Sequence, residues 1–183
     1  AYALGDATKA YSPAKLSDFR RSIVYLRNFA GTHPVIVVHD RVVSTSPDFA
    51  KTYLLHSINQ PGINQKLATL SIDDGTDAAR TAFLFQETVL PSDAAITVIG
   101  GPDTGPFWVA DDGNRVGHNY VEGLRTAEEY DKARLEAGNW RVEVKPGAPR
   151  AADSFLHVLT VAESASAAPA VATRLSSPPG ADA

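Results

Sequence analysis

Chemistry-bearing side chains are most concentrated in residues 107–120, which read FWVADDGNRVGHNY. The tryptophan and tyrosine rings of this stretch can stack on the apolar face of a sugar ring, and the arginine can pair bidentately with a carboxylate or sulfate. The candidate substrate-binding residues are Trp108, Arg115, His118, Asn119 and Tyr120. The sequence favours an alternative, in which Phe107 and Trp108 are core aromatics beside a solvated loop, because β-sandwich cores are often built around a tryptophan.

Patterns that would identify a catalytic or metal-binding site do not occur in the sequence. The histidines form neither an H-x-H nor an H-E-x-x-H pattern, so spacing alone places no two imidazoles on one face. There is no G-x-S-x-G turn for a nucleophilic serine, and the glycines at 100 and 101 lack the Lys-Ser/Thr of a phosphate loop. We therefore assign no catalytic residue and no metal ligand. Each histidine is interpreted first as a structural residue: His33, His39, His56, His118 and His157.

The composition is that of a folded globular chain and narrows the classes of partner. The 183 residues are 44% hydrophobic, and 17 basic against 21 acidic residues give a net charge of −4. No net positive charge favours nucleic acid or an anionic membrane. No apolar run approaches the roughly 20 residues of a membrane-spanning helix. We expect neither a nucleic-acid partner nor a membrane partner.

The absence of cysteine removes several chemistries at once. It excludes disulfides, a thiolate nucleophile, an iron–sulfur cluster and cysteine-ligated zinc, and it leaves the cellular compartment open. Methionine is also absent, and Ala1 begins a strand-like stretch rather than a signal peptide. We interpret the chain as a piece of a longer protein, with an alanine-rich composition as the alternative explanation.

Hydrophobic periodicity predicts an all-β fold, an antiparallel β-sandwich with one short surface helix. Short apolar or alternating runs are separated by Gly, Pro, Asp and Asn clusters, which is typical of such sandwiches. The helix is expected after a capping box formed by Thr126 and Glu129, and it should end at Gly138. We expect a sandwich domain over residues 1–162 and an Ala/Ser/Pro-rich flexible tail over residues 163–183. The expected strands cover residues 19–29, 34–43, 51–58, 67–72, 81–89, 96–99, 107–110, 140–145 and 153–162.

An ordered series of short strings resembles the heparinase II/III-like polysaccharide lyases. The strings begin with GDAT at residues 5–8 and continue with HPVIVVHDRVVS at 33–44 and LLHSINQP at 54–61. They end with WRVE at 140–143 and the strand that begins at Asp153. Each string is weak alone, but the series runs in order from Gly5 to about residue 161.

The resemblance implies a large lyase in which a helical toroid precedes β-sandwich layers. Such enzymes cleave acidic polysaccharides by β-elimination: a base removes the proton beside the uronate carboxylate, and an acid assists the departing oxygen. From the resemblance, the family's catalytic tyrosine and histidine, and the His/Asp cluster of its structural zinc, are expected in segments before Ala1. No catalytic or zinc role is therefore carried over to a residue of this sequence.

From the resemblance we expect the β-sandwich portion of such a lyase, with little or no activity by itself. No cofactor is expected in this chain, and a structural zinc is expected only in the parent enzyme. The expected partners are an acidic polysaccharide and the N-terminal helical portion of the same lyase, and the expected location is periplasmic or secreted. The alternative is a free-standing carbohydrate-binding or structural module.

Overall fold

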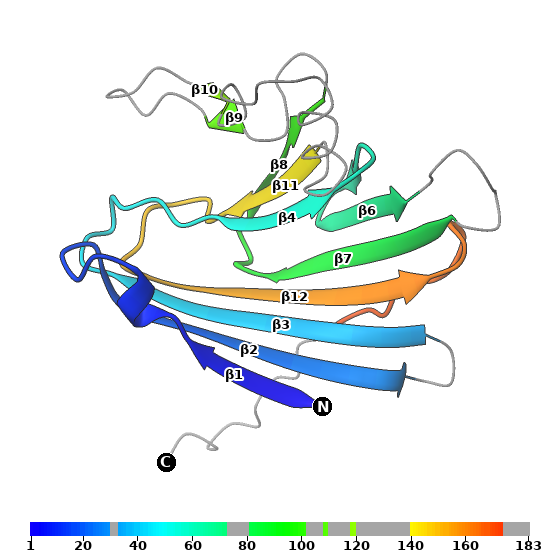
Figure 1. Cartoon of the computed structure of the whole chain (residues 1–183), viewed down its shortest axis with the longest axis horizontal. Helices are drawn as coiled ribbons and strands as arrows, with labels where there is room; N and C mark the ends of the chain where they lie inside the picture. Colours follow the sequence, from blue (N-terminus) through cyan, green and yellow to red (C-terminus); the bar gives the residue numbers. More distant parts are fainter. Residues whose placement is uncertain (30–32, 73–80, 102–107, 110–117, 120–139, 174–183) are drawn as a thin grey trace, which may run out of the picture.

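A seven-stranded sheet forms the larger layer of the fold (Figure 1). The computed structural model describes residues 1–29, 33–72, 81–101, 108–109, 118–119 and 140–173. All neighbouring strands of this main sheet pair antiparallel, in the order β1-β2-β3-β12-β7-β6-β5. Their bounds are Tyr2–Asp6 (β1), Leu16–Phe29 (β2), His33–Ser44 (β3), Gly62–Asn64 (β5), Leu67–Ile72 (β6), Ala82–Leu90 (β7) and Ala152–Ala162 (β12).

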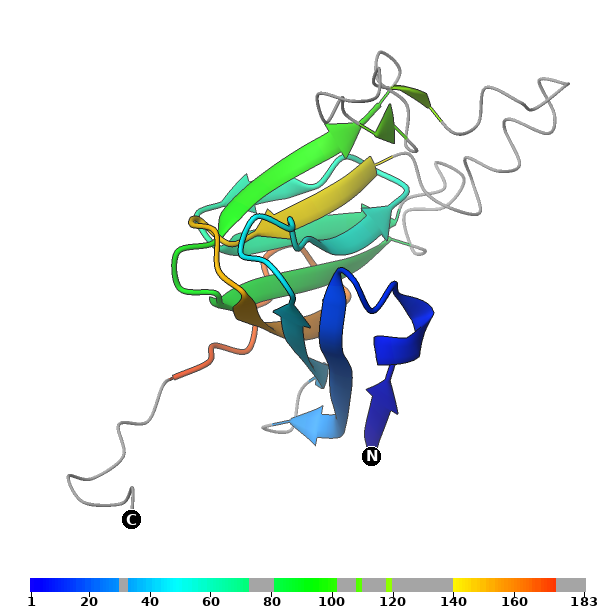
Figure 2. The ribbon, with the colours of Figure 1, turned by 90° about the vertical axis from the view of Figure 1, so that its left-hand side faces the viewer.

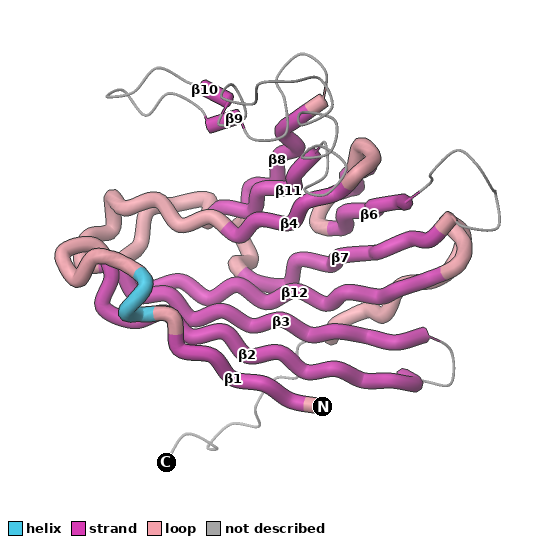
Figure 3. Tube along the Cα trace, viewed as in Figure 1, coloured by secondary structure: helices cyan, strands magenta, loops and turns pink. Residues whose placement is uncertain are grey.

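A smaller, three-stranded sheet forms the second layer, in the order β4-β11-β8. These strands are Tyr53–Ser57 (β4), Trp140–Lys145 (β11) and Ala95–Gly100 (β8), and both pairings are antiparallel. A separate two-stranded pair joins β9 (Trp108–Val109) to β10 (His118–Asn119). Figure 3 shows that strands dominate the described residues, beside one 3₁₀ turn, η1 (Thr8–Ala10). The fold is an all-β sandwich, as the periodicity predicts.

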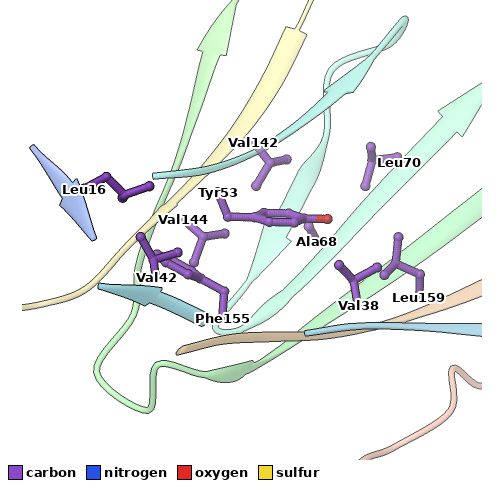
Figure 4. Close-up of a cluster of buried hydrophobic side chains, with 10 residues drawn as sticks. All are labelled: Leu16, Val38, Val42, Tyr53, Ala68, Leu70, Val142, Val144, Phe155 and Leu159. Carbon is purple, nitrogen blue, oxygen red and sulfur yellow. The ribbon is translucent and has the colours of Figure 1, made fainter. Parts of the chain in front are cut away.

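The core lies between the two sheets and follows from the alternation of side chains along each strand. Val142 and Val144 of β11 are fully buried and face the main sheet, whose Phe155 and Leu159 point toward them (Figure 4). Tyr53 of β4 lies between these groups. The buried cluster comprises Leu16, Val38, Val42, Tyr53, Ala68, Leu70, Val142, Val144, Phe155 and Leu159.

Strand β11 is also buried on its polar face. Arg141 and Glu143 alternate with the core valines and are each only 7% exposed. They form an ion pair in which Nε of Arg141 lies 2.8 Å from Oε1 of Glu143, and Lys145 pairs with the same carboxylate. Mutual pairing is what allows such charges to be buried.

The observed strands lie within a few residues of the expected ones, and β11 has the expected bounds. The short strands β5 and β10 are absent from the expected set, because runs of two or three residues carry little periodicity, and β1 is expected only as the strand-like stretch after Ala1. The expected helix after Thr126 lies outside the described residues. Strand β12 ends at Ala162, and the segment that follows it hydrogen-bonds to the main sheet. The backbone N–H groups of Ala170 and Ala172 donate to Thr160 and Glu87, respectively.

The two sheets differ in width, and the smaller one leaves part of the main sheet uncovered. In Figure 2, the dark blue strands β1 and β2 lie beyond the green and yellow strands of the small sheet. Ile23 and Tyr25 of β2 pair in register with the core-facing residues Val38 and Ile36 of β3. Each is nevertheless 37% exposed. The inner face of the main sheet is therefore accessible near β1 and β2.

Replacing Phe155 by alanine should lower the free energy of unfolding by about 3–5 kcal/mol, because it removes a ring that is 2% exposed at the centre of the core. Urea unfolding followed by tryptophan fluorescence would measure the change. Leu4→Ala is the control, since Leu4 is 61% exposed and its loss should change stability by no more than about 0.5 kcal/mol. Equal effects of the two substitutions would contradict the assigned core.

Candidate functional site

A groove of about 710 Å³ occupies the uncovered inner face of the main sheet. Strands β2 and β3 form its floor, β4 borders it, and residues 49–52 close one side. We call it the inner-face groove and define it by Tyr11, Phe19, Arg21, Asp40, Phe49 and Tyr53. A volume of this size falls within the range of about 300–1,000 Å³ that is typical of small-molecule sites.

A bidentate ion pair between Arg21 and Asp40 lies on the floor of the groove. The two residues face each other in the β2–β3 register. Nε of Arg21 donates to Oδ1 of Asp40 at 2.7 Å, and Nη2 donates to Oδ2 at 2.6 Å. The side chain of Asp40 is 4% exposed, whereas that of Arg21 is 44% exposed. Hydrogen bonding to Asp40 raises the pKa of Arg21, so the guanidinium stays charged.

Two stacked rings lie beside this ion pair. The rings of Tyr53 and His157 are 3.8 Å apart between centroids, and the Arg21 guanidinium carbon lies 5.7 Å from the centroid of the Tyr53 ring. Nδ1 of His157 is 3.3 Å from Oγ1 of Thr88. His157 comes from β12 and Tyr53 from β4, so the stack joins the two sheets.

Burial keeps both rings neutral at ordinary pH. Desolvation raises the pKa of the Tyr53 phenol to about 12. Desolvation, reinforced by the charge of Arg21, lowers the pKa of His157 to about 4. An effective general base or acid needs a pKa near the operating pH and access to substrate. His157 is fully buried. The stacked pair is therefore unsuited to proton transfer and serves to support the groove.

The segment that carries Phe49 is held by the buried cation of Lys51. Its Nζ lies 3.4 Å from Oδ2 of Asp153 and donates to Oγ of Ser44 and to two backbone carbonyl oxygens. Both charged groups are nearly inaccessible to solvent. The exposed Lys15 lies on the groove rim, with its Nζ 5.9 Å from the centroid of the Phe49 ring. The groove thus combines fixed aromatic walls with cationic groups.

The residues predicted from the sequence to bind substrate are only partly described. The β9–β10 register places Asn119 opposite Trp108 and His118 opposite Val109, so the structure brings these backbone positions together. The side chains of these residues, and Arg115 and Tyr120 altogether, lie outside what the structure describes. The described residues that line the inner-face groove come mainly from β2, β3, β4 and the segment 49–52.

The spacing of residues in the sequence does not reveal the groove, but one residue indicates a buried ion pair. Asp40 is a lone carboxylate inside the most apolar run of the chain, and such a group requires a buried cationic partner. Which arginine supplies that charge depends on strand register.

The other described histidines lie apart from the groove. His56 is exposed, and His33 and His39 are partly buried. Within the described ranges, no three His, Asp or Glu side chains gather in a way that could hold a metal ion.

The described part of the chain contains no helix with the length and apolar character needed to cross a membrane. No protein-family model and no curated protein matches the sequence.

His157 should make the fold less stable as the pH falls. Its pKa is about 4 in the folded state and 6.5 when unperturbed, so between these values only the unfolded chain takes up the proton. The contribution is fully present above pH 6.5 and decreases as the pH falls, by roughly 3 kcal/mol at about pH 4, at 1.36 kcal/mol per pKa unit.

Urea unfolding measured across this pH range should show this decline in the native protein and a flatter dependence in His157→Leu. The control, Leu4→Ala, changes an exposed residue that does not titrate and should retain the native slope. An unchanged slope in His157→Leu would contradict the assignment.

Proposed function

We propose that this chain is the β-sandwich portion of a heparinase II/III-like polysaccharide lyase. Such a lyase would act by β-elimination on uronate-containing acidic polysaccharides, and this portion would shape the substrate cleft without supplying its catalytic groups. The ordered strings from Gly5 to about residue 161 support the proposal, and so does the antiparallel sandwich that they form.

The observation that carries the non-catalytic part of the proposal is the neutral ring pair beside the groove. β-Elimination needs a base near the proton to be removed and an acid near the departing oxygen. The pKa of Tyr53 is raised to about 12 and His157 is inaccessible, so neither group meets this need. The groove instead offers cationic and aromatic contacts, which complement an anionic sugar.

The uncovered apolar side chains at one edge of the main sheet fit a chain that docks on a larger partner. Ile23 and Tyr25 of β2 are each 37% exposed on the inner face of the main sheet, and Tyr2 and Leu4 of β1 are more than half exposed on its outer face. Exposed apolar surface commonly marks an interaction site. In the proposal, the helical portion of the same lyase covers this edge.

The chain alone should not depolymerise heparin, heparan sulfate or alginate. Each polysaccharide would be incubated with the purified protein, and the ultraviolet absorbance of the unsaturated product would be followed, with an active polysaccharide lyase as positive control. We expect no increase above the protein-free sample, because no described group is tuned for proton transfer. Sustained turnover by this chain would contradict the non-catalytic assignment.

A second candidate function is a free-standing carbohydrate-binding module, which the aromatic and arginine residues of 107–120 favour. Isothermal titration with acidic oligosaccharides should then give saturable, salt-sensitive heats. Trp108→Ala and Arg115→Ala should each weaken binding by about tenfold, through loss of stacking and of a charged hydrogen bond. The absence of heats with every oligosaccharide would reject this candidate.

A further inference from the structure

We propose that the inner-face groove is a subsite for one carboxylate-bearing sugar residue, in which Arg21 binds the carboxylate and Phe49 and Tyr11 flank the ring. This inference rests on the proposed function and deepens it, because it places the anionic sugar in a groove distant in sequence from residues 107–120.

Arg21 has a hydrogen-bonding edge that Asp40 does not use. A guanidinium has five N–H donors, and Asp40 accepts from only Nε and Nη2. The edge formed by Nη1 and the second Nη2 hydrogen has no hydrogen-bond partner among the described residues. With 44% of the side chain exposed, this edge can take a carboxylate bidentately.

Asp40 also pre-orients the arginine for this role. Two hydrogen bonds to a buried carboxylate hold the guanidinium plane, so little side-chain entropy remains to be lost when a ligand binds. The aromatic face of Tyr53 lies on another side of the guanidinium and restricts its motion further.

The charge balance of the groove favours an anion. Its lining contains three cations, Lys15, Arg21 and Lys51, and one anion, Asp40. Asp40 balances Arg21, and Asp153 balances Lys51, so Lys15 leaves a net positive charge at the rim. A groove with this balance attracts an anion and does not repel a carboxylate that approaches Arg21.

The aromatic surface of the groove favours a sugar over a bare anion. Tyr11 is 51% exposed and Phe49 is 37% exposed, and both line the groove. Tyr11 is supported from behind by an edge-to-face contact with Phe19 at 5.7 Å. The Phe49 segment is held by the buried Lys51. Rigid, accessible rings beside a carboxylate-binding arginine suit a uronate, which presents an apolar ring face next to its charge.

The test is a titration of the full chain with methyl β-glucuronide, followed by NMR of backbone amides and of the arginine Nε–H groups. The matched neutral probe is methyl β-glucoside, which carries a hydroxymethyl group in place of the carboxylate. We expect saturable shifts at Arg21 and around Phe49 with the glucuronide, and binding at least about tenfold weaker with the glucoside.

Three changes in the groove should alter this binding. Arg21→Lys keeps a cation beside Asp40 but loses the bidentate edge, and it should weaken glucuronide binding by about tenfold. The double variant Arg21→Met/Asp40→Leu removes the arginine together with its buried partner, so it avoids an unpaired carboxylate and should abolish the preference for glucuronide. Phe49→Ala should weaken the binding of both probes, the glucuronide and the glucoside. The control, Arg20→Gln, alters the neighbouring arginine on the opposite face of β2 and should change nothing.

Several outcomes would overturn the inference. Sulfate that binds as tightly as the glucuronide and responds to the same substitutions would show a simple anion site. Glucuronide binding that is lost in Trp108→Ala but retained in the Arg21 variants would reject the groove and leave the proposed function intact. If acidic oligosaccharides bind but the glucuronide causes no NMR shift at Arg21, the groove is likewise rejected and the proposed function stays intact. If neither the oligosaccharides nor the glucuronide binds, both the inference and the binding role fail.

Discussion

The carboxylate of Asp40 is the group around which the groove is arranged. It is 3% exposed within an apolar strand, where an unpaired charge would be strongly destabilising. Arg21 neutralises it from the adjacent strand, Tyr53 packs over Arg21, and His157 stacks on Tyr53. A one-residue slip of β2 against β3 would move Arg21 to the other face of the sheet and leave Asp40 unpaired. The ion pair therefore constrains both the register of β2 against β3 and the contact between the two sheets.

The same arrangement sets the chemical character of the groove. Arg21 remains charged beside its carboxylate. Burial lowers the pKa of His157, and the charge of Arg21 lowers it further. Burial raises the pKa of Tyr53, because it disfavours the phenolate. The result is a permanently charged group next to two neutral rings. Such a set can bind and orient an anion, whereas it has little capacity to exchange protons.

The unequal widths of the two sheets explain why the groove is accessible. The small sheet packs over the centre of the main sheet and buries Phe155 and Leu159, but β2 extends past it. On the opposite face, the segment after β12 hydrogen-bonds to Thr160 and Glu87. The accessible apolar side chains include Ile23 and Tyr25 of β2, which lie on the same face of the main sheet as the groove.

The longer strands could be predicted from the sequence, because side-chain alternation is a local property that each segment carries. Residues 140–145 illustrate this: their alternation predicts β11, including which residues face the core. The contacts of Arg21 with Asp40 and of Tyr53 with His157 became evident only in the folded chain. These contacts depend on strand register and sheet packing, which join residues far apart in the chain. Sequence reasoning favoured residues 107–120 because their functional groups are neighbours along the chain, whereas the groove is assembled from residues that are neighbours only in space.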